Sequence, residues 1–461
     1  MKIHTIHTEP SEKKGYRGQL LWFTDNPFLH PEEECFRYES DGMLIVEEAG
    51  LIVDAGEYNE MMRRYPETSV VTDHRGSLIM PGFIDTHLHY VQSPMIGSYG
   101  DTLLHWLNQY TFPTEARFYD KEYANTAAKM ALRQMLSHGT TTANVFSTTF
   151  ATSVDAFFEE SERFGTRMIT GKVLQDRNLP DNLRDRSTEE SIEISRRLMN
   201  KWHGKGRQLY AVIPRFAPTS TPLQLKLAGE LYQENTGRGV YMHTHLGECE
   251  SEIEWVAELF PEADNYTDVY RRFGLLGPRS ILAHCCIMKP EEWRMLYDYG
   301  SSAAHCPSSN LFLGDGQFRF WECTDATHPC QFGIGTDVGG GTSFSILRQI
   351  GEAYKVGMLE SHPLSPLKSF YLATLGGAKA LRLDNCIGTF RPGHEADFTV
   401  INLHADEFTI YRLSHARTLQ ETLSVIQTLG FDNFISHTYV SGRNVYTRDS
   451  DRQFRYADEA R

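Results

Sequence analysis

Short apolar runs alternate with longer helical patterns through the middle of the 461-residue chain. Residues 120–139, for example, carry apolar positions at a 3.6-residue period and end in glycine, which predicts a helix. The strand-like runs are 83–89, 141–146, 167–176, 209–219, 240–247, 280–286, 301–309 and 332–338. Eight strands with helical connections over about 300 residues are typical of a (β/α)8 barrel, although an open doubly wound sheet has the same rhythm.

Both ends of the chain are instead rich in predicted strands. Short apolar segments with Gly, Asp, Pro and Asn turns between them cover residues 19–27, 37–56, 74–80, 388–403 and 435–449. We therefore expect an α/β fold in which residues 81–388 form the barrel. A small β-sandwich domain would be assembled from residues 1–80 and 389–461.

Composition narrows the class of protein. Hydrophobic residues make up 40% and charged residues 23% of the chain, as in soluble globular proteins, and no apolar run has the length of a membrane span. The net charge of −15 and the lack of a Lys/Arg-rich run argue against a nucleic-acid partner. Residues 1–18 lack the apolar core of a signal peptide, so we expect a cytoplasmic protein. Eight scattered cysteines without a Cys-x-x-Cys pair indicate free thiols.

Polar residues stand at or just beyond the ends of six predicted strands. They are His87, His89, Arg215, His243, His245, Glu248, His284, His305 and Asp337. In a barrel, the carboxyl ends of all strands face one mouth, where such enzymes keep their active sites. The sequence therefore predicts that these side chains converge, although they are far apart along the chain.

His87 and His89 are separated by two positions on an apolar strand, so both face the same side. Two inward imidazoles suggest two ligands of one metal ion, while the alternative is a pair of histidines satisfied by hydrogen bonds. The metal interpretation is favoured because His245, His284 and Asp337 occupy corresponding places on other strands. Imidazoles with one carboxylate suit Zn²⁺ or Fe²⁺, and such an ion activates water for hydrolysis.

Three nearby residues have two interpretations each. Glu248 lies beyond a strand end and suits proton transfer, but an acidic residue at the start of a helix is often only solvated. His243 fits a structural role as well as a chemical one. His305 is better suited to orient a neighbour by a hydrogen bond than to bind a metal.

Five motifs together resemble the amidohydrolase superfamily. They occur in the order of that family, as "PGFIDTHLH" from residue 81, "HTHLGE" from residue 243, "LAHC" from residue 282, "HCPSSN" from residue 305 and "GTDVGGG" from residue 335. The flanking β segments are similar to the small domain that this family builds from both termini. The resemblance thus covers nearly the whole chain and implies a metal-dependent hydrolase.

Residues 89–115 and 214–220 are further similar to segments of the family members that deaminate guanine. This resemblance implies one Zn²⁺ per chain, with Fe²⁺ as an alternative, and a homodimer. It implies Glu248 as the proton shuttle and His284 as the residue that holds the water or the substrate. The implied metal ligands are His87, His89, His245 and Asp337, and the implied guanine contacts are Gln92, Arg215, Phe216 and His284. His243 departs from the Gln that related deaminases often have, which leaves its role open.

The chemistry of guanine suits these residues. Its amidine-like C2 carries the amino group, so attack by water at C2 gives xanthine and ammonia. Asp337 can take a proton from the water and Glu248 can protonate the adjacent ring nitrogen. Arg215 offers a planar fork of donors for the O6 carbonyl, and Gln92 can donate or accept at a purine edge. Phe216 either stacks on the base or only packs.

Two other functions remain open at this level. The same machinery could act on another heterocycle, such as 8-oxoguanine, a pterin, an adenosine-type base or a chloro-triazine. A non-catalytic scaffold is the alternative from a different class, and the complete set of ligand residues argues against it. A metal assay separates the two classes, because a scaffold should bind no stoichiometric metal.

Overall fold

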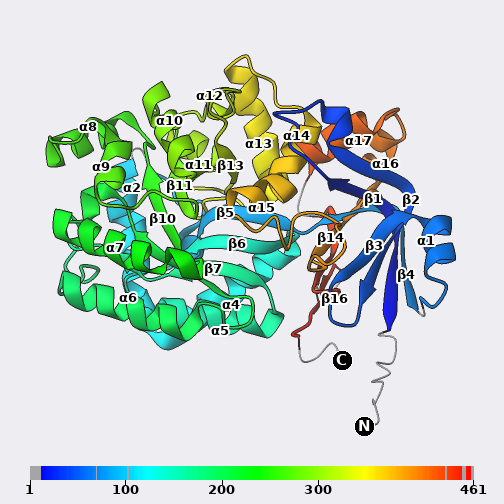
Figure 1. Ribbon diagram of the computed structural model, residues 1–461, viewed down its shortest axis with the longest axis horizontal. Coiled ribbons are helices and arrows are strands. Elements are labelled where there is room, and N and C mark those ends of the chain that lie inside the picture. The colour runs from blue at the N-terminus through cyan, green and yellow to red at the C-terminus, as the bar shows by residue number, and fades with distance from the viewer. Residues whose placement is uncertain (1–11, 69, 101–102, 431–432, 449–452, 458–461) are drawn as a thin grey trace, which may run out of the picture.

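The computed structural model describes residues 12–68, 70–100, 103–430, 433–448 and 453–457, and most of their strands belong to two sheets that lie side by side (Figure 1). The parallel sheet, to the left in Figure 1, follows the order β13-β12-β11-β10-β9-β7-β6-β5, with β8 paired to β9. Its strands are β5 (Phe83–His89), β6 (Thr140–Phe146), β7 (Arg167–Gly171), β8 (Val173–Leu174), β9 (Leu209–Pro214), β10 (Tyr241–Leu246), β11 (Ser280–His284), β12 (Ser302–His305) and β13 (Gln331–Ile334).

The two edge strands of this sheet meet just beyond the end of β13. The backbone N–H of Asp337 donates to the carbonyl oxygen of His87 over 2.9 Å. The backbone N–H and the hydroxyl of Thr336 both donate to the carboxylate of Asp85, over 3.0 and 2.5 Å. These bonds bring the first and last strands together, so the sheet is a nearly closed barrel, and the predicted barrel architecture is confirmed.

Three of the predicted strands run four or five residues past the observed strand ends. The prediction of 301–309 was too long because Pro307 begins helix α11 (Pro307–Leu313), where its missing N–H costs nothing. β13 ends at Ile334, before Asp337 adopts a φ of +47°. β9 ends at Pro214, and residues 217–219 form a 3₁₀ turn instead of continuing the strand.

Helices cover the outside of the barrel. Those with buried apolar faces include α4 (Lys121–Ser137), α5 (Ala151–Phe164), α6 (Thr188–Trp202), α7 (Pro222–Asn235), α8 (Glu250–Leu259), α9 (Tyr266–Arg272), α10 (Pro290–Tyr299) and α13 (Ile346–Leu359). The shorter helices of this half are α2 (Leu103–Trp106), α3 (Phe112–Glu115), α12 (Phe320–Cys323), α14 (Pro366–Tyr371) and α15 (Gly377–Ala380). Helix α4 illustrates how the sequence specifies such a helix. Asp120 caps its first turn, and Ala124, Ala128 and Leu132 repeat every four residues on its buried face.

A mixed sheet forms the second unit, to the right in Figure 1, and its strands come from both ends of the chain. Its order is β17-β16-β15-β14-β4-β1-β2-β3. The strands are β1 (Lys13–Phe23), β2 (Phe36–Glu47), β3 (Ile52–Glu57), β4 (Val70–Pro81), β14 (Phe398–Asn402), β15 (Ile435–Val440), β16 (Arg443–Thr447) and β17 (Gln453–Phe454). Helix α1 (Tyr58–Arg64) follows β3, and α16 (Glu407–Leu413) and α17 (Leu419–Leu429) lie between β14 and β15 in the chain. The prediction of a small β domain from both termini is confirmed.

The described part of the chain contains no helix that is both long and apolar enough to cross a membrane. The stretch 1–18, which lacks a signal-peptide pattern, lies mostly outside the described residues.

An apolar layer of strand residues supports the mouth of the barrel. It includes Ile84, Phe146, Ile169, Ile213 and Tyr241, all of them buried. The ring of Phe146 lies 4.5 to 5.3 Å, centroid to centroid, from the imidazoles at positions 87, 89, 243 and 245. The polar side chains therefore stand on a packed floor that limits their freedom to rotate.

Arg207, just before β9, joins the barrel to the mixed sheet. Its guanidinium donates to the Asp397 carboxylate over 2.5 and 3.1 Å and also pairs with Glu395. Both carboxylates lie in the segment that leads into β14, and Asp397 is buried. The ion-pair cluster thus fixes the position of one unit against the other.

We expect Arg207→Met to destabilise the protein, because the buried Asp397 carboxylate would lose its main counter-ion. The expected cost is about 3 kcal/mol in the free energy of unfolding, the scale of a broken buried ion pair. Arg196→Met is the matched control, since its ion pair with Glu234 is exposed and should contribute less than about 0.5 kcal/mol. Urea titration of both variants measures the difference, and equal midpoints would show that the Arg207 cluster does not stabilise the junction.

Candidate active site

One cavity at the barrel mouth collects most of the residues predicted from the strand ends. It is lined by His89, Gln92, Trp106, Leu107, Arg215, Phe216, His245, Glu248, His284, Leu313, Asp337 and Gly340. His87 and His243 are fully buried and do not line it. The convergence predicted from the sequence is therefore found in the fold.

Hydrogen bonds at one ring nitrogen aim the other nitrogen of two histidines toward the centre of the site. His245 Nδ1 lies 2.7 Å from the carbonyl oxygen of Arg215, which can only accept, so this nitrogen carries the proton. His87 Nδ1 lies 2.8 Å from His243 Nε2. The Nε2 atoms of His87 and His245 are thereby left for another partner, the arrangement typical of metal-binding histidines.

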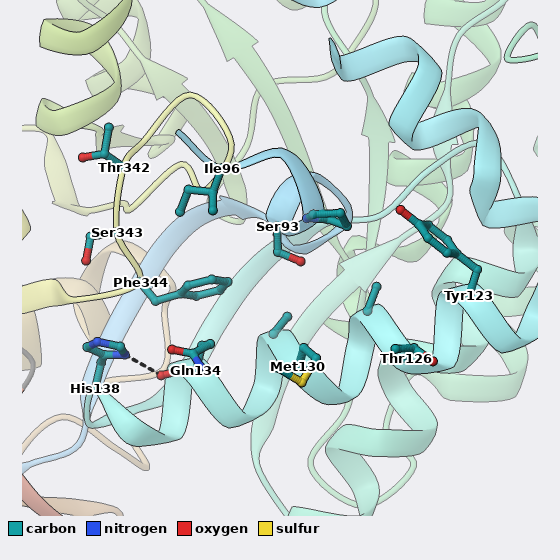
Figure 2. Close-up of a pocket in the computed structure, with 13 residues that line it drawn as sticks. Ser93, Ile96, Tyr123, Thr126, Met130, Gln134, His138, Thr342, Ser343 and Phe344 are labelled. Carbon is teal, nitrogen blue, oxygen red and sulfur yellow. Dashed lines mark hydrogen bonds between the residues drawn. The ribbon is translucent and has the colours of Figure 1, made fainter. Parts of the chain in front are cut away.

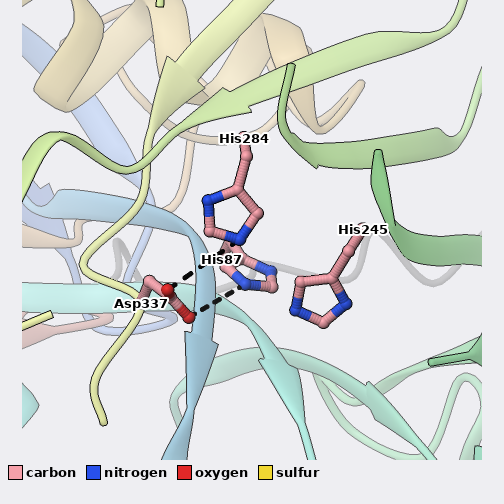
Figure 3. A group of neighbouring side chains, drawn as sticks. All are labelled: His87, His245, His284 and Asp337. Atoms are coloured by element: carbon pink, nitrogen blue, oxygen red, sulfur yellow. Dashed lines mark ion pairs between the residues drawn. The ribbon is translucent and has the colours of Figure 1, made fainter. Parts of the chain in front are cut away.

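Five donors gather around one point. His87, His245, His284 and Asp337 each place a ligand atom within 4.8 Å of the others (Figure 3). His87 Nε2 lies 3.1 Å from Asp337 Oδ1. His89 Nε2 also reaches the group, at 3.4 Å from Asp337 Oδ1 and 3.0 Å from His245 Nε2.

These donors fit a divalent metal ion. Burial lowers the pKa of His87, His89 and His245 well below the usual histidine value, so the imidazoles are neutral, the form that binds a metal. His87 Nε2 is buried and, although Asp337 Oδ1 lies 3.1 Å away, it makes no hydrogen bond of acceptable geometry among the described residues. A buried nitrogen without a partner is costly unless something binds it. Imidazole nitrogens with one carboxylate match the ligand set of zinc or iron.

Glu248 lies just beyond β10, with its carboxylate 3.5 Å from His284 Nε2. Its backbone N–H donates to Glu252 over 2.7 Å, which holds the turn that presents it. Burial, together with the nearby charges of Asp315, Asp337 and Glu252, raises the pKa of Glu248 well above the usual carboxyl value. The side chain is thus buried and can carry a proton, unlike a solvated residue at a helix start.

His284 is held by Asn310 on α11. His284 Nδ1 lies 2.8 Å from the Asn310 side-chain oxygen, so its Nε2 faces Glu248 and lies 3.9 Å from Asp337 Oδ2. His284 and Asp337 both have positive φ, at +74° and +47°. Such values are uncommon for residues other than glycine and concentrate at functional sites, where the surrounding structure holds the strain.

Arg215 and Gln92 also line the cavity and share one carboxylate. Arg215 Nη1 donates to Glu115 Oε2 over 2.7 Å, and Gln92 Nε2 donates to Glu115 Oε1 over 2.9 Å. All three side chains are buried. Phe216 lies beside them, with its ring 6.5 Å from that of His245 and 6.2 Å from that of Trp255.

His305 does not line the cavity. Its ring stacks on Phe318 at 4.7 Å, and burial lowers its pKa to about 3. Cys285 and Cys286 are buried, and burial raises the pKa of both thiols well above the usual value, which suits inert thiols.

Several residues of the site were not singled out in the sequence: Trp106, Leu107 and Leu313 line the cavity, and Glu252 holds the turn of Glu248. Three more position polar groups of the site. Asp85 aligns β5 with β13, Asn310 orients His284, and Glu115 pairs with Arg215. Two of them lay inside quoted motifs, Asp85 in "PGFIDTHLH" and Asn310 in "HCPSSN". Glu115 closes the segment 89–115, and its only signal was an acidic residue at the end of an otherwise apolar and aromatic helix.

A more spacious cavity of about 540 Å³ lies elsewhere, between α4 and the loop that carries Phe344 (Figure 2). Its lining is mainly apolar or weakly polar, with Met130 and Tyr123 on the helix side. Its single titratable imidazole, His138, is bonded within α4 to the Gln134 carbonyl oxygen over 2.7 Å. Nothing in this cavity offers a metal ligand set or an acid–base pair, so it is not the catalytic centre.

Comparison with known proteins agrees with the geometry. The model of the amidohydrolase family matches residues 78–445, which include every residue of the cavity. A curated guanine deaminase of Escherichia coli (strain K12) is 46% identical over 438 residues, which cover 95% of this chain and 98% of the relative.

Solved structures give the same picture. The structure of an E. coli guanine deaminase has a TM-score of 0.90 at 45% identity and covers 95% of this chain and 100% of its own. A guanine deaminase from C. acetobutylicum, solved with guanine bound in its active site, has a TM-score of 0.84 at 26% identity and covers 94% and 100%.

Proposed function

Since the chain belongs to the amidohydrolase family, we propose that it is a guanine deaminase, which converts guanine and water into xanthine and ammonia. The observation that carries the proposal is that one cavity joins two kinds of chemistry. It is lined by imidazoles and carboxylates suited to hydrolysis and also by Gln92 and Arg215, suited to the polar edge of a purine. Guanine is the ligand that the relative from C. acetobutylicum binds.

The proposed metal ligands are His87, His89, His245 and Asp337. Ligand atoms held about 2.0–2.1 Å from one zinc ion lie roughly 3 to 3.5 Å from their neighbours, and a catalytic site also keeps a position open for water. The contacts of 3.0, 3.1 and 3.4 Å among these four residues support this set. His284, with 3.9 Å to Asp337, is left beside the metal to hold the water or the substrate.

A bound metal ion would supply a Lewis acid that lowers the pKa of water. The side chains do the rest of the proton chemistry. Asp337 accepts a proton from the attacking water. Glu248 delivers its proton to the ring nitrogen beside C2, then takes a proton from the added hydroxyl group and passes it to the departing amino group, which leaves as ammonia. The proton held by Asp337 returns to Glu248, which restores both carboxyl groups for the next cycle. His284, fixed by Asn310, keeps the nucleophile and the ring carbon in line.

A separate group of side chains that line the cavity recognises the base. Arg215 donates to the O6 carbonyl through the N–H groups that Glu115 does not occupy, and Gln92 bonds the polar edge of the ring. Phe216 lines the same cavity and packs against the base. These assignments rest on the position of the side chains and on the resemblance to guanine deaminases.

Three finer points belong to the same proposal. The metal is zinc, one per chain, with Fe²⁺ as the alternative; the chain assembles as a homodimer; and it acts in the cytoplasm. The competing substrates are 8-oxoguanine, a pterin, an adenosine-type base or a triazine, and the competing non-catalytic role is a scaffold.

The metal assignment predicts different outcomes for neighbouring histidines. His89→Ala and His245→Ala should lower the bound metal at least ~10-fold, because each removes a ligand. His284→Ala should keep the metal and lose activity. His74→Gln is the control, since His74 is buried in the mixed sheet and bonds Tyr439 instead. Metal content by mass spectrometry decides: loss of metal in His284→Ala with retention in His89→Ala would reverse the assignment.

Glu248→Gln keeps the size and hydrogen bonding of the side chain but cannot move a proton. We expect kcat to fall at least ~100-fold with the metal retained, the usual scale of a positioned acid–base group. Steady-state ammonia release and metal content are measured on the same preparation. A kcat within a few-fold of wild type would mean that the proton travels by another route.

Substrate choice is the third expectation. Guanine places an acceptor, O6, before the donors of Arg215, whereas adenine places an amino donor there. Two buried donors facing each other cost roughly 1–3 kcal/mol each, so we expect a preference of ~10²–10⁴ in kcat/KM for guanine. Ammonia release is compared for guanine, adenine, guanosine, 8-oxoguanine and a triazine. If kcat/KM is higher for any of the last four compounds than for guanine, that compound is the substrate and the assignment of guanine is wrong.

A further inference from the structure

Glu115 is a fully buried carboxylate that touches both side chains proposed to recognise the base. It ends the short helix α3, and its two oxygens accept separately, Oε1 from Gln92 Nε2 and Oε2 from Arg215 Nη1. We propose that Glu115 is a positioning residue that sets the substrate selectivity of this cavity by orienting Gln92 and Arg215. The inference rests on the proposed function, because it assumes that the base is read at O6.

The orientation of the Gln92 amide follows from the chemistry of its neighbour. A carboxylate can only accept, so the nitrogen end of the amide must face Glu115. The oxygen end lies against Gly339, where a Cβ would be only 2.0 Å from Gln92 Oε1. Gly339 also has a φ of +120°, which L residues with a side chain rarely adopt. The amide is thus fixed at its nitrogen end, the absence of a side chain at Gly339 leaves room for its oxygen, and turning the amide over would set that oxygen against the Glu115 carboxylate.

Arg215 is held in a similar way. Its charge is buried, and the Glu115 carboxylate is the partner that compensates it. One amino group of the guanidinium is committed to Glu115, and the Phe112 ring lies 5.7 Å from the guanidinium carbon. The main chain of Arg215 is fixed as well, because its carbonyl oxygen accepts from the His245 ring and backbone. The remaining N–H groups can therefore present donors in a constant direction.

A fixed array of donors selects an acceptor. If Glu115 is changed, the amide of Gln92 can turn over and the guanidinium of Arg215 can swing. The cavity then tolerates a donor where guanine has O6. The loss should appear in the choice between substrates more than in the rate of the chemical step, since the hydrogen bonds of the Glu115 side chain within the described structure go to Gln92 and Arg215 and not to the proposed metal ligands or Glu248.

Guanine and 2,6-diaminopurine are the two substrates whose kcat/KM values test the proposal. Both carry the 2-amino group that leaves, and the second replaces the O6 acceptor by an amino donor. In the ratio of kcat/KM for guanine to that for 2,6-diaminopurine, any loss of enzyme activity that affects both reactions equally cancels. Ammonia is measured together with the product, because removal of the 2-amino group from 2,6-diaminopurine gives isoguanine, whereas removal of the 6-amino group gives guanine.

Two variants are compared with wild type. Glu115→Gln keeps the shape but puts an amide N–H₂ against Gln92 or Arg215, so the selectivity ratio should fall at least ~10-fold, with a higher KM for guanine and a smaller change in kcat. Glu115→Asp keeps the charge that compensates Arg215, which protects folding, but is too short to reach both partners. Its ratio should also fall. Metal content should stay at the wild-type level in both.

A matched control and a double-mutant cycle separate positioning from stability. Glu292→Gln alters another buried carboxylate, one that bonds Thr267 and lies away from the cavity, and should leave the ratio unchanged. In the Gln92→Ala background, Glu115→Gln should raise KM less than it does in wild type. The reason is that Gln92, one of the two side chains that Glu115 orients, is already absent.

The outcomes are distinct. If wild type releases ammonia from guanine and both Glu115 variants keep the wild-type ratio and KM, the positioning role is wrong and the proposed function stands. Additive effects of Glu115→Gln and Gln92→Ala would likewise overturn the coupling. If wild type does not act on guanine, the proposed function fails, and the inference fails with it.

Discussion

The meeting of β5 with the segment after β13 is the constraint on which the site depends. Asp337 and His87 are 250 positions apart in the chain, yet a backbone hydrogen bond joins them, and Asp85 accepts two more from Thr336. These bonds bring the first strand and the last one together, so the acid and the imidazoles share one mouth. The chemistry is therefore a consequence of barrel closure, since no local motif could place these groups within reach of one another.

Closure of the barrel buries several polar and charged groups close together, and each burial costs free energy. Neutral imidazoles, the carboxyl group of Glu248, whose pKa burial raises, and the ion pair of Arg215 are all taken out of water. A hydrogen bond or ion pair to a neighbouring group offsets the free energy that each burial costs. His245 bonds the Arg215 carbonyl oxygen, the Glu248 backbone bonds the Glu252 carboxylate, and the guanidinium pairs with Glu115. Arg215 connects the two parts of the proposed chemistry, since its carbonyl oxygen accepts from the ring of His245, a proposed metal ligand, and its side chain lines the cavity. On this proposal, hydrolysis and recognition are coupled through one residue.

The sequence predicted the barrel and its strand-end residues because both depend on local patterns. An apolar strand with His87 and His89 two positions apart is informative on its own, since the pair must share a face. The partners of these residues could not be predicted in this way. Glu115 looks like any acidic residue at a helix end, and the choice between His89 and His284 as ligand depends on distances of a few tenths of an ångström. Strand ends were also missed where proline or a positive φ stops the strand, as at Pro307 and Asp337.

The central claim is that one cavity both binds guanine and adds water to its C2. Turnover of guanine in ¹⁸O-labelled water tests this most directly, with mass spectrometry of the purine product and measurement of ammonia from the same reaction. We expect xanthine that carries one labelled oxygen, located at C2, and one ammonia for each molecule formed. A metal-loaded protein that leaves guanine unchanged, or xanthine without the label, would contradict the account.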